Sequence, residues 1–157
     1  MGRDHRYGAT VRWTSNHGAG TSSYQSYGRT HEITGHGKPA IAGSADPAFR
    51  GEADRWNPEE LLIVSLSQCH LLWYLHLAAV SAIVVTHYSD EPIGTVSETP
   101  DGSGQFTDVL LRPTVTVAQR TMVAEADALH DRVHAMCFIA RSVSFPVRHH
   151  PLTHVAS

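Results

Sequence analysis

Two cysteines are the residues of this chain whose type and spacing could do chemistry. Cys69 lies in the stretch NPEELLIVSLSQCHLLW and Cys137 lies in HAMCFIARSVSFPV, and each falls on the apolar stripe of a predicted helix. Free cysteines usually behave as small buried hydrophobic residues, so each thiol taken alone could be filler. Two packed helices could instead bring the thiols within bonding range as a redox pair, in which one attacks and the other resolves.

The helix that carries Cys69 has clear start signals. Asn57 suits the N-cap, Pro58 suits the first helical position, and Glu60 is where a capping box needs its carboxylate. Glu59 and Glu60 place negative charge at the positive end of the helix dipole. The periodic run continues to about residue 79. Cys69 is in the third turn, beyond the reach of the dipole, so a cation from elsewhere would have to stabilise its thiolate.

The other predicted elements give an α+β fold rather than a parallel βαβ repeat. A second helix is predicted over residues 122–140, where apolar side chains follow the 3.6-residue period. Residues 93–99 and 105–117 flank PDGSG and predict a hairpin. Pro146 predicts an edge strand, because it cannot donate to a central ladder. The remaining strand candidates are residues 7–14, 22–34, 81–89 and 142–150.

Composition excludes several classes of protein. The chain has 157 residues, 41% of them hydrophobic, a net charge of −3 and 12 histidines, which fits a single domain over residues 1–157. Scattered Lys and Arg do not predict a nucleic-acid partner, and the most apolar window is too short to predict a membrane span. Two cysteines do not make a secreted disulfide framework, so a cytoplasmic protein is predicted.

The Asn-Pro-Glu start, the cysteine ten residues after that glutamate and the later HAMCFIARSVSFPV resemble the OsmC/Ohr family of thiol-dependent peroxidases. The resemblance covers nearly the whole chain in its order of elements. It implies antiparallel sheets around two cysteine-bearing helices in an intertwined homodimer. It also implies a hydroperoxide substrate, an external dithiol reductant and no cofactor.

By this resemblance, Cys69 corresponds to the peroxidatic thiol, Cys137 to the resolving thiol and Glu59 to the glutamate of the motif. The family's arginine from the N-terminal β region corresponds to Arg29 in SYGRTHEI, with Arg50 and Arg55 as alternatives. Glu59 is about 15 Å along a straight helix from Cys69, so it would act in the partner subunit's site. An apolar entrance is predicted for organic peroxides, lined by Leu62, Leu66, Leu72 and Trp73.

The chain departs from the Ohr branch at two positions. His70 follows the first cysteine where that branch has an aromatic residue, and Phe138 follows the second where that branch has proline. Both differences favour the OsmC side or an unclassified branch.

Two other functions stay open. His130, His134 and Cys137 have the i, i+4, i+7 spacing of a zinc-binding helix face, which Cys69 or His70 could complete. A non-catalytic sensing module, in which the thiol pair reports oxidation without turnover, is the second. We interpret His149, His150 and His154 in the tail RHHPLTH as flexible surface residues.

Overall fold

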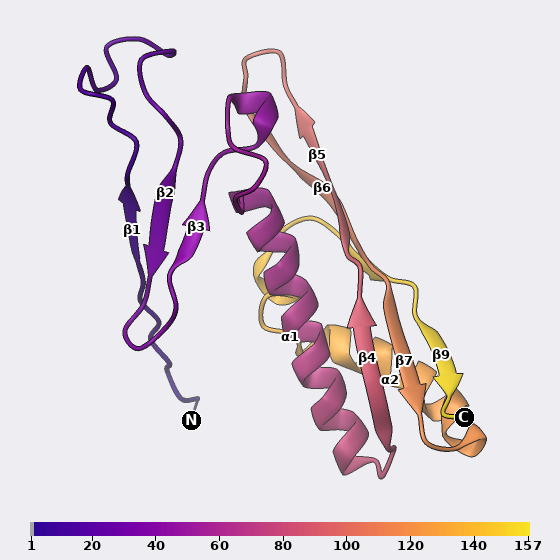
Figure 1. Ribbon diagram of the computed structural model, residues 1–157. Helices are drawn as coiled ribbons and strands as arrows, with labels where there is room; N and C mark the ends of the chain where they lie inside the picture. The colour runs from indigo at the N-terminus through magenta and orange to yellow at the C-terminus, as the bar shows by residue number, and fades with distance from the viewer. Residues whose placement is uncertain (1) are drawn as a thin grey trace. The chain divides into compact units, whose positions relative to one another are not determined.

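The computed structural model describes residues 2–157, which form two compact units. The first unit ends at Leu61 and the second runs from Leu62 to Ser157. A single domain over the whole chain stays a prediction. Figure 1 shows the elements in chain order.

The first unit contains a three-stranded antiparallel sheet in the order β1-β2-β3. The prediction of strands over residues 7–14 and 22–34 is right in place but too long. The segment before β2 turns instead, because the Ser26 hydroxyl bonds the carbonyl oxygens of Gly20 and Ser23, both at 2.8 Å. The strands are β1 (Thr10–Trp13), β2 (His31–Thr34) and β3 (Ile41–Gly43).

The second unit contains two three-stranded sheets, in the orders β4-β7-β9 and β5-β6-β8. The predicted hairpin is confirmed as the antiparallel pair β5–β6, and β8 is at a sheet edge as Pro146 predicted. The strands are β4 (Val85–Asp90), β5 (Ile93–Glu98), β6 (Gly104–Leu111), β7 (Pro113–Val117), β8 (Val147–His149) and β9 (Leu152–Val155).

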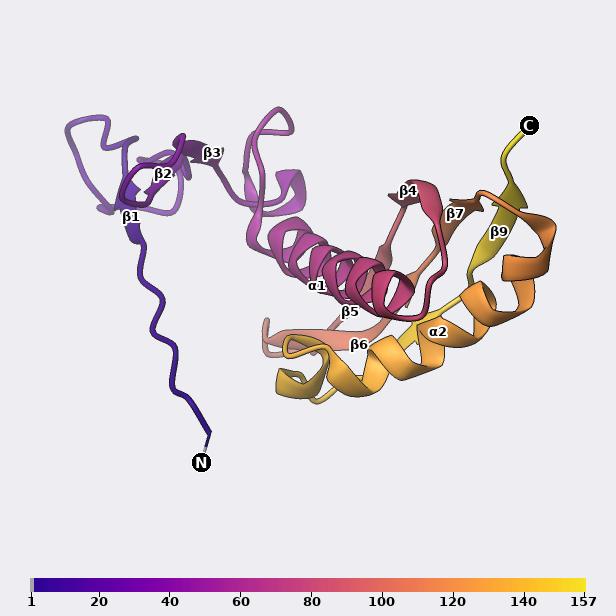
Figure 2. The same cartoon turned by 90° about the horizontal axis from the view of Figure 1, so that it is seen from below.

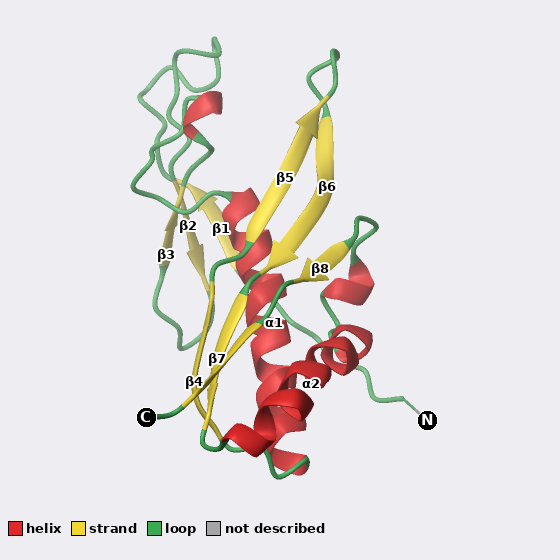
Figure 3. Cartoon of the chain, turned by 90° about the vertical axis from the view of Figure 1, so that its right-hand side faces the viewer, coloured by secondary structure: helices red, strands yellow, loops and turns green. Residues whose placement is uncertain are grey.

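These two sheets are mixed rather than purely antiparallel, since β8 pairs parallel to β6 and β9 pairs parallel to β7. The single strand predicted over residues 105–117 is two strands. Arg112 interrupts it, because its N–H donates to the Asp90 carboxylate at 2.7 Å and Pro113 follows without a donor. β6 and β7 therefore enter different sheets (Figure 3).

Within residues 2–157 the structure has two α-helices, α1 (Pro58–Val80) and α2 (Val123–Met136). Cys69 lies within α1, and Cys137 directly follows α2. The start of α1 is as predicted. The predicted helix over residues 122–140 stops four residues early, because Cys137 takes an extended conformation with φ −67° and ψ 112°. Short 3-10 turns add η1 (Pro47–Phe49), η2 (Arg120–Met122) and η3 (Ala140–Ser142).

The core of the second unit has two parts, and α1 contributes to both. Its Leu66 packs with Val109, Leu111 and Val147 of β6 and β8. Further along α1, a second cluster packs both helices against β7 (Figure 2). That cluster contains Tyr74, Leu77, Ala78, Ile83, Val115, Val117, Ala126, Leu129 and Val133.

α1 is longer than the apolar window that the sequence suggested. With 23 residues it is long and apolar enough to cross a membrane by length and composition alone. A core helix of a soluble protein can meet the same criteria, so this helix is weak support for a membrane span.

Candidate functional site

Cys69 lies eleven residues after Pro58, the first residue of α1, and the start of this helix is fixed by hydrogen bonds. The Asn57 side chain accepts from the Glu60 N–H at 2.8 Å, and the Asn57 N–H donates to the Glu60 carboxylate at 3.3 Å. This is the capping box that the sequence predicted. The Cys69 side chain is partly exposed, which a thiol that meets a substrate requires.

Cys137 is the residue that ends α2, and it is 1% exposed. Its N–H donates to the Val133 carbonyl at 2.9 Å, and its sulfur accepts from the Ala140 N–H at 3.4 Å. Burial raises the pKa of the Cys137 thiol, and the neighbouring Cys69 thiol raises it further. The fold thus brings the two thiols together, as predicted, with both cysteines free.

Glu59 is partly buried in the first turn of α1, ten residues before Cys69 on the same helix. At about 1.5 Å rise per residue, the two side chains are about 15 Å apart along the helix axis. The carboxylate that accepts a hydrogen bond from the Asn57 N–H at the helix start belongs to Glu60, not to Glu59. Within its own chain, α1 does not bring Glu59 to the thiol.

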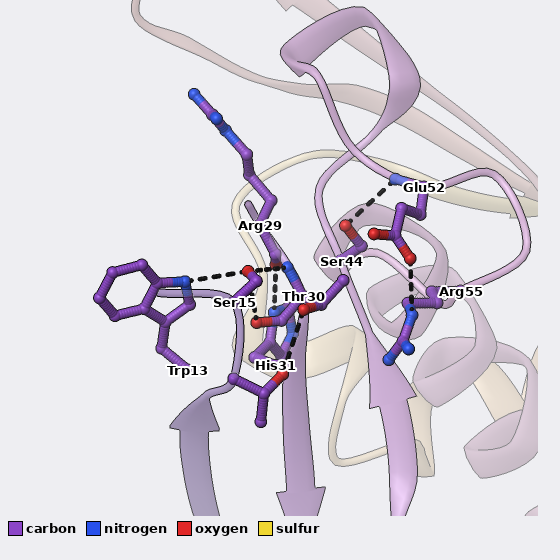
Figure 4. A network of polar contacts seen from close by, with 9 residues as sticks. Trp13, Ser15, Arg29, Thr30, His31, Ser44, Glu52 and Arg55 are labelled. Carbon is purple, nitrogen blue, oxygen red and sulfur yellow. Dashed lines mark hydrogen bonds and ion pairs between the residues drawn. The ribbon is translucent and has the colours of Figure 1, made fainter. Parts of the chain in front are cut away.

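Arg29 belongs to the first unit, where two tyrosines hold its guanidinium. The guanidinium carbon is 4.4 Å from the ring centroid of Tyr24 and 4.1 Å from that of Tyr27. The same group donates to both tyrosines' carbonyl oxygens. No carboxylate among residues 2–157 forms an ion pair with Arg29, and Figure 4 shows its side chain pointing away from the strands. Its pairing with Cys69 stays a prediction.

The alternative arginines differ from Arg29 in their partners. Arg55 forms an ion pair with Glu52 at 2.9 Å, so its charge is already neutralised (Figure 4). Arg50 ends η1 in the left-handed conformation, with φ 65°. Its guanidinium carbon is 5.9 Å from the Tyr24 ring centroid, farther than that of Arg29. Within the first unit, Arg29 is the better held of the three.

Two of the four residues predicted to line an apolar entrance line a surface pocket, and the entrance itself stays a prediction. Leu66 is fully buried in the core and cannot line an entrance. Leu72, by contrast, is 64% exposed and lines a surface pocket of about 230 Å³ with Trp73 and His76. The Trp73 ring also meets the exposed Phe138 ring edge-on, with centroids 5.8 Å apart. Leu62 is partly buried.

A group of histidines lies beside the thiols, and the sequence analysis missed it. His70 Nε2 and His130 Nδ1 are 2.9 Å apart, and both side chains are buried. His149 is partly buried in β8 and contacts Asp131 at 3.1 Å, so it is not a flexible tail residue. Periodicity could have found the pair, because each histidine falls on the packing face of its helix.

The described residues do not support the zinc hypothesis. Among residues 2–157, no group of three His, Cys, Asp or Glu side chains is arranged to hold a metal ion. His130 turns its Nδ1 to His70, while His134 is exposed on the same helix. The i, i+4, i+7 spacing therefore reflects helix packing at one position and solvent exposure at another.

Fold and thiols together define an α+β protein in which a core helix presents one cysteine beside a second, buried cysteine. The sequence model of the OsmC-like protein family matches residues 51–150, so this chain belongs to that family. Family membership supports a role related to redox chemistry or peroxides.

Solved structures agree with the family. An OsmC-like protein of unknown function from Vibrio cholerae is similar over 95% of this chain and 100% of its own, at 27% identity and a TM-score of 0.85. An organic hydroperoxide resistance protein from Legionella pneumophila has 20% identity over 97% of this chain and 100% of its own, with a TM-score of 0.65.

A second organic hydroperoxide resistance protein, from Elizabethkingia anophelis, has 15% identity over 98% of this chain and 100% of its own, with a TM-score of 0.66. At these identities the two resistance proteins show the fold alone. No curated protein matches the chain.

Proposed function

We propose that this protein is a thiol-dependent peroxidase that reduces organic hydroperoxides, and also hydrogen peroxide at a lower rate. The observation that carries the proposal is the pair of neighbouring cysteines, one partly exposed and one buried, in which Cys69 raises the pKa of Cys137. A peroxidatic thiol must meet substrate, whereas a resolving thiol only has to reach the first sulfur. The two environments match these two roles.

Peroxide reduction by this site takes three steps. The Cys69 thiolate attacks the distal peroxide oxygen, the O–O bond breaks, and the alkoxide takes a proton and leaves as an alcohol. Cys69 is then a sulfenic acid. The Cys137 thiol attacks its sulfur, a disulfide forms and water leaves. An external dithiol reduces the Cys69–Cys137 disulfide by exchange and becomes oxidised itself.

Other parts of the site come from the family resemblance. Arg29 stabilises the Cys69 thiolate and orients the peroxide, because a guanidinium keeps its charge and offers several donors. Glu59 serves the partner subunit's site in a homodimer, which removes the problem of its distance from Cys69. The exposed Leu72 and half-buried Trp73 favour an apolar hydroperoxide. We place the protein in the cytoplasm.

Steady-state peroxide consumption with dithiothreitol tests the proposal, using hydrogen peroxide, an alkyl hydroperoxide and a lipid hydroperoxide. We expect turnover that is fastest with an organic peroxide. Peptide mapping after one equivalent of peroxide should show the Cys69–Cys137 disulfide within one chain. A disulfide without turnover would support the sensing module instead, and two free thiols would contradict both.

A further inference from the structure

A cluster of histidines joins α1, α2 and β8 next to the cysteines. His70 comes from α1, His130 from α2 and His149 from β8. The His70 and His130 rings are nearly parallel, with centroids 5.2 Å apart, and the His149 centroid is 5.9 Å from each. His134 lies 6.4 Å from His149 at the exposed side of the cluster. The two helices whose segments position the thiols therefore meet β8 at imidazole rings.

The buried His70–His130 pair can form its hydrogen bond only if one of the two facing ring nitrogens is unprotonated and accepts. At 2.9 Å, one of His70 Nε2 and His130 Nδ1 donates and the other accepts. A pair protonated on both rings has two donors facing each other and no acceptor. The His130 ring also stacks on Tyr74 with centroids 4.3 Å apart, and among residues 2–157 its Nε2 has no hydrogen-bond partner. Burial of the pair opposes an added positive charge more than the nearby carboxylates of Asp127 and Asp131 favour it.

The pair is part of the same helix contact as the thiols. The Tyr74 hydroxyl donates to the Ala126 carbonyl at 3.1 Å, one helical turn from the histidine contact on both helices. His70 directly follows Cys69, and Cys137 lies two turns after His130. Separating the His70 and His130 rings would therefore move α2, and with it Cys137 directly after its last residue, away from Cys69.

We propose that the His70–His130 pair positions Cys137 beside Cys69 and makes closure of the disulfide sensitive to acid. This inference rests on the proposed function, since it concerns the resolving step of that reaction. At neutral pH the hydrogen-bonded pair holds α1 and α2 in the arrangement that keeps Cys137 next to Cys69. Below about pH 6 the protonated rings separate the helices. Attack of Cys137 on the Cys69 sulfenic acid then becomes slower.

Electrostatics support this direction. Burial, followed by the charges of His130, His149 and His134, lowers the pKa of His70 to about 3. Burial and His149 lower the pKa of His130 to about 4, although the carboxylates of Asp127 and Asp131 act in the opposite sense. In a separated state the rings would regain their ordinary pKa of about 6.5. Two protons then favour separation, so its equilibrium constant rises up to about a hundredfold per pH unit below pH 6.

The remaining ionisable groups around the pair do not reverse this effect. Asp131 is exposed and bonded to His149 of β8, and Asp127 is exposed and accepts from Thr153 of β9. Arg148 of β8 is paired with Asp108 of β6 at 2.7 Å. From α1, the facing ionisable group is Tyr74, whose pKa burial raises to about 12, so it stays neutral.

Two-step release of a chromophore from 2,2′-dithiodipyridine tests the proposal without any peroxide. The first pyridine-2-thione leaves when Cys69 forms a mixed disulfide, and the second leaves when Cys137 attacks that disulfide and closes the Cys69–Cys137 bond. The reagent reacts with thiols in acid as well as at neutral pH. Rates of the second release are measured from pH 7.5 to 5.0, within the range where circular dichroism shows an unchanged fold.

The matched variant is the double change His70→Gln and His130→Asn. Gln places a polar atom where His70 has Nε2 and Asn places one where His130 has Nδ1, and neither can be protonated. The ratio of wild-type to variant closure rates cancels the ordinary titration of the thiols. We expect that ratio to fall about fivefold or more between pH 7.5 and 5.0. His134→Asn, at an exposed position of the same helix, should keep the wild-type profile.

A ratio that stays constant with pH would overturn the acid sensitivity while leaving the proposed function intact. Absence of the second release at every pH would overturn the resolving role of Cys137, and this inference with it. If the double variant does not fold, the ratio of wild-type to His130→Asn closure rates is measured instead, and it must still fall between pH 7.5 and 5.0. A ratio that stays constant there would contradict the proposal.

Discussion

Two neighbouring residues of α1 serve the contact with α2 in opposite ways. Cys69 is partly exposed, and its partner Cys137 ends a helix where the backbone becomes irregular. His70 is buried, and its partner His130 lies inside regular helix. One residue of an α-helix turns by about 100°, so one position can meet solvent while the next is fixed in the core. We call Cys69 and Cys137 the thiol end of this helix contact, and His70 and His130 its histidine end. The comparison suggests that the thiol end supplies reactivity and the histidine end supplies position.

The largest effect should come from the thiol end. Cys69→Ser should lower the rate of peroxide reduction by about a thousandfold or more, because a serine hydroxyl does not ionise near neutral pH. Cys137→Ser should allow one turnover and then stall or over-oxidise, since the sulfenic acid has no partner. Stopped-flow consumption of peroxide and intact-protein mass spectrometry measure the two results. Normal turnover in Cys69→Ser would contradict the role of Cys69 as the attacking thiol, and with it the contrast between the thiol end and the histidine end.

The histidine end should appear in the pH dependence of stability. The folded-state pKa values of His70 and His130, about 3 and 4, are below the ordinary 6.5. The unfolded chain therefore binds more protons as the pH falls from 6.5 towards 4, so stability is present above pH 6.5 and is lost across that range. Between pH 7 and 5 the free energy of unfolding should fall by about 3 kcal/mol.

Urea unfolding of the wild type and of the His70→Gln, His130→Asn double variant at both pH values measures this loss. The variant should lose much less than the wild type, because its polar groups do not titrate. Equal losses in both proteins would assign the pH dependence to other groups.

A smaller effect concerns the source of positive charge for the thiol end. Arg29→Ala should slow peroxide attack by about tenfold, because an opposite charge favours the thiolate. Arg29→Lys should recover part of that rate, since one ammonium cannot reproduce the planar guanidinium. The rate of Cys69 alkylation against pH is the measurement. Arg55→Ala is the matched control, because Arg55 is already paired with Glu52. Loss of rate in the control alone would move the role to Arg55.

The smallest effect tests the helix start that both ends share. Asn57→Ala removes the acceptor for the Glu60 N–H and should cost about 1 kcal/mol in the free energy of unfolding. Asn57→Asp keeps an acceptor and should stay near the wild type. Chemical denaturation measures both variants. A loss in Asn57→Asp as large as that in Asn57→Ala would show that the side-chain oxygen is not what matters.

The cysteine helix and the hairpin could be predicted from the sequence because their signals are local. Asn57, Pro58 and Glu60 act within one turn, and PDGSG joins two strands that pair with each other. The end of α2 could not be predicted, since the apolar period continues past Met136 while the backbone turns at Cys137. The break at Arg112 depends on Asp90, a residue 22 positions away.

The candidate site divides in the same way. Inward cysteines on two helices predicted their contact, because each packing face is visible in the period of apolar residues. Periodicity places each histidine of the pair on the packing face of its helix. Which residues of the two helices face each other does not follow from it, because α1 and α2 are joined through four intervening strands. Arg29 and Glu59 still rest on family resemblance, since no local pattern assigns them to a thiol.

The parallel pairing of β8 with β6 and of β9 with β7 has a consequence for synthesis on the ribosome. These strands come after α2 in the chain, yet each completes one of the two sheets of the second unit. Until residues 147–155 emerge, both sheets have two strands and β6 and β7 each keep an unpaired edge. Long-range pairings of this kind form late and leave edges open to association. The nascent protein should therefore depend on chaperones that cover β6 and β7 until residues 147–155 emerge.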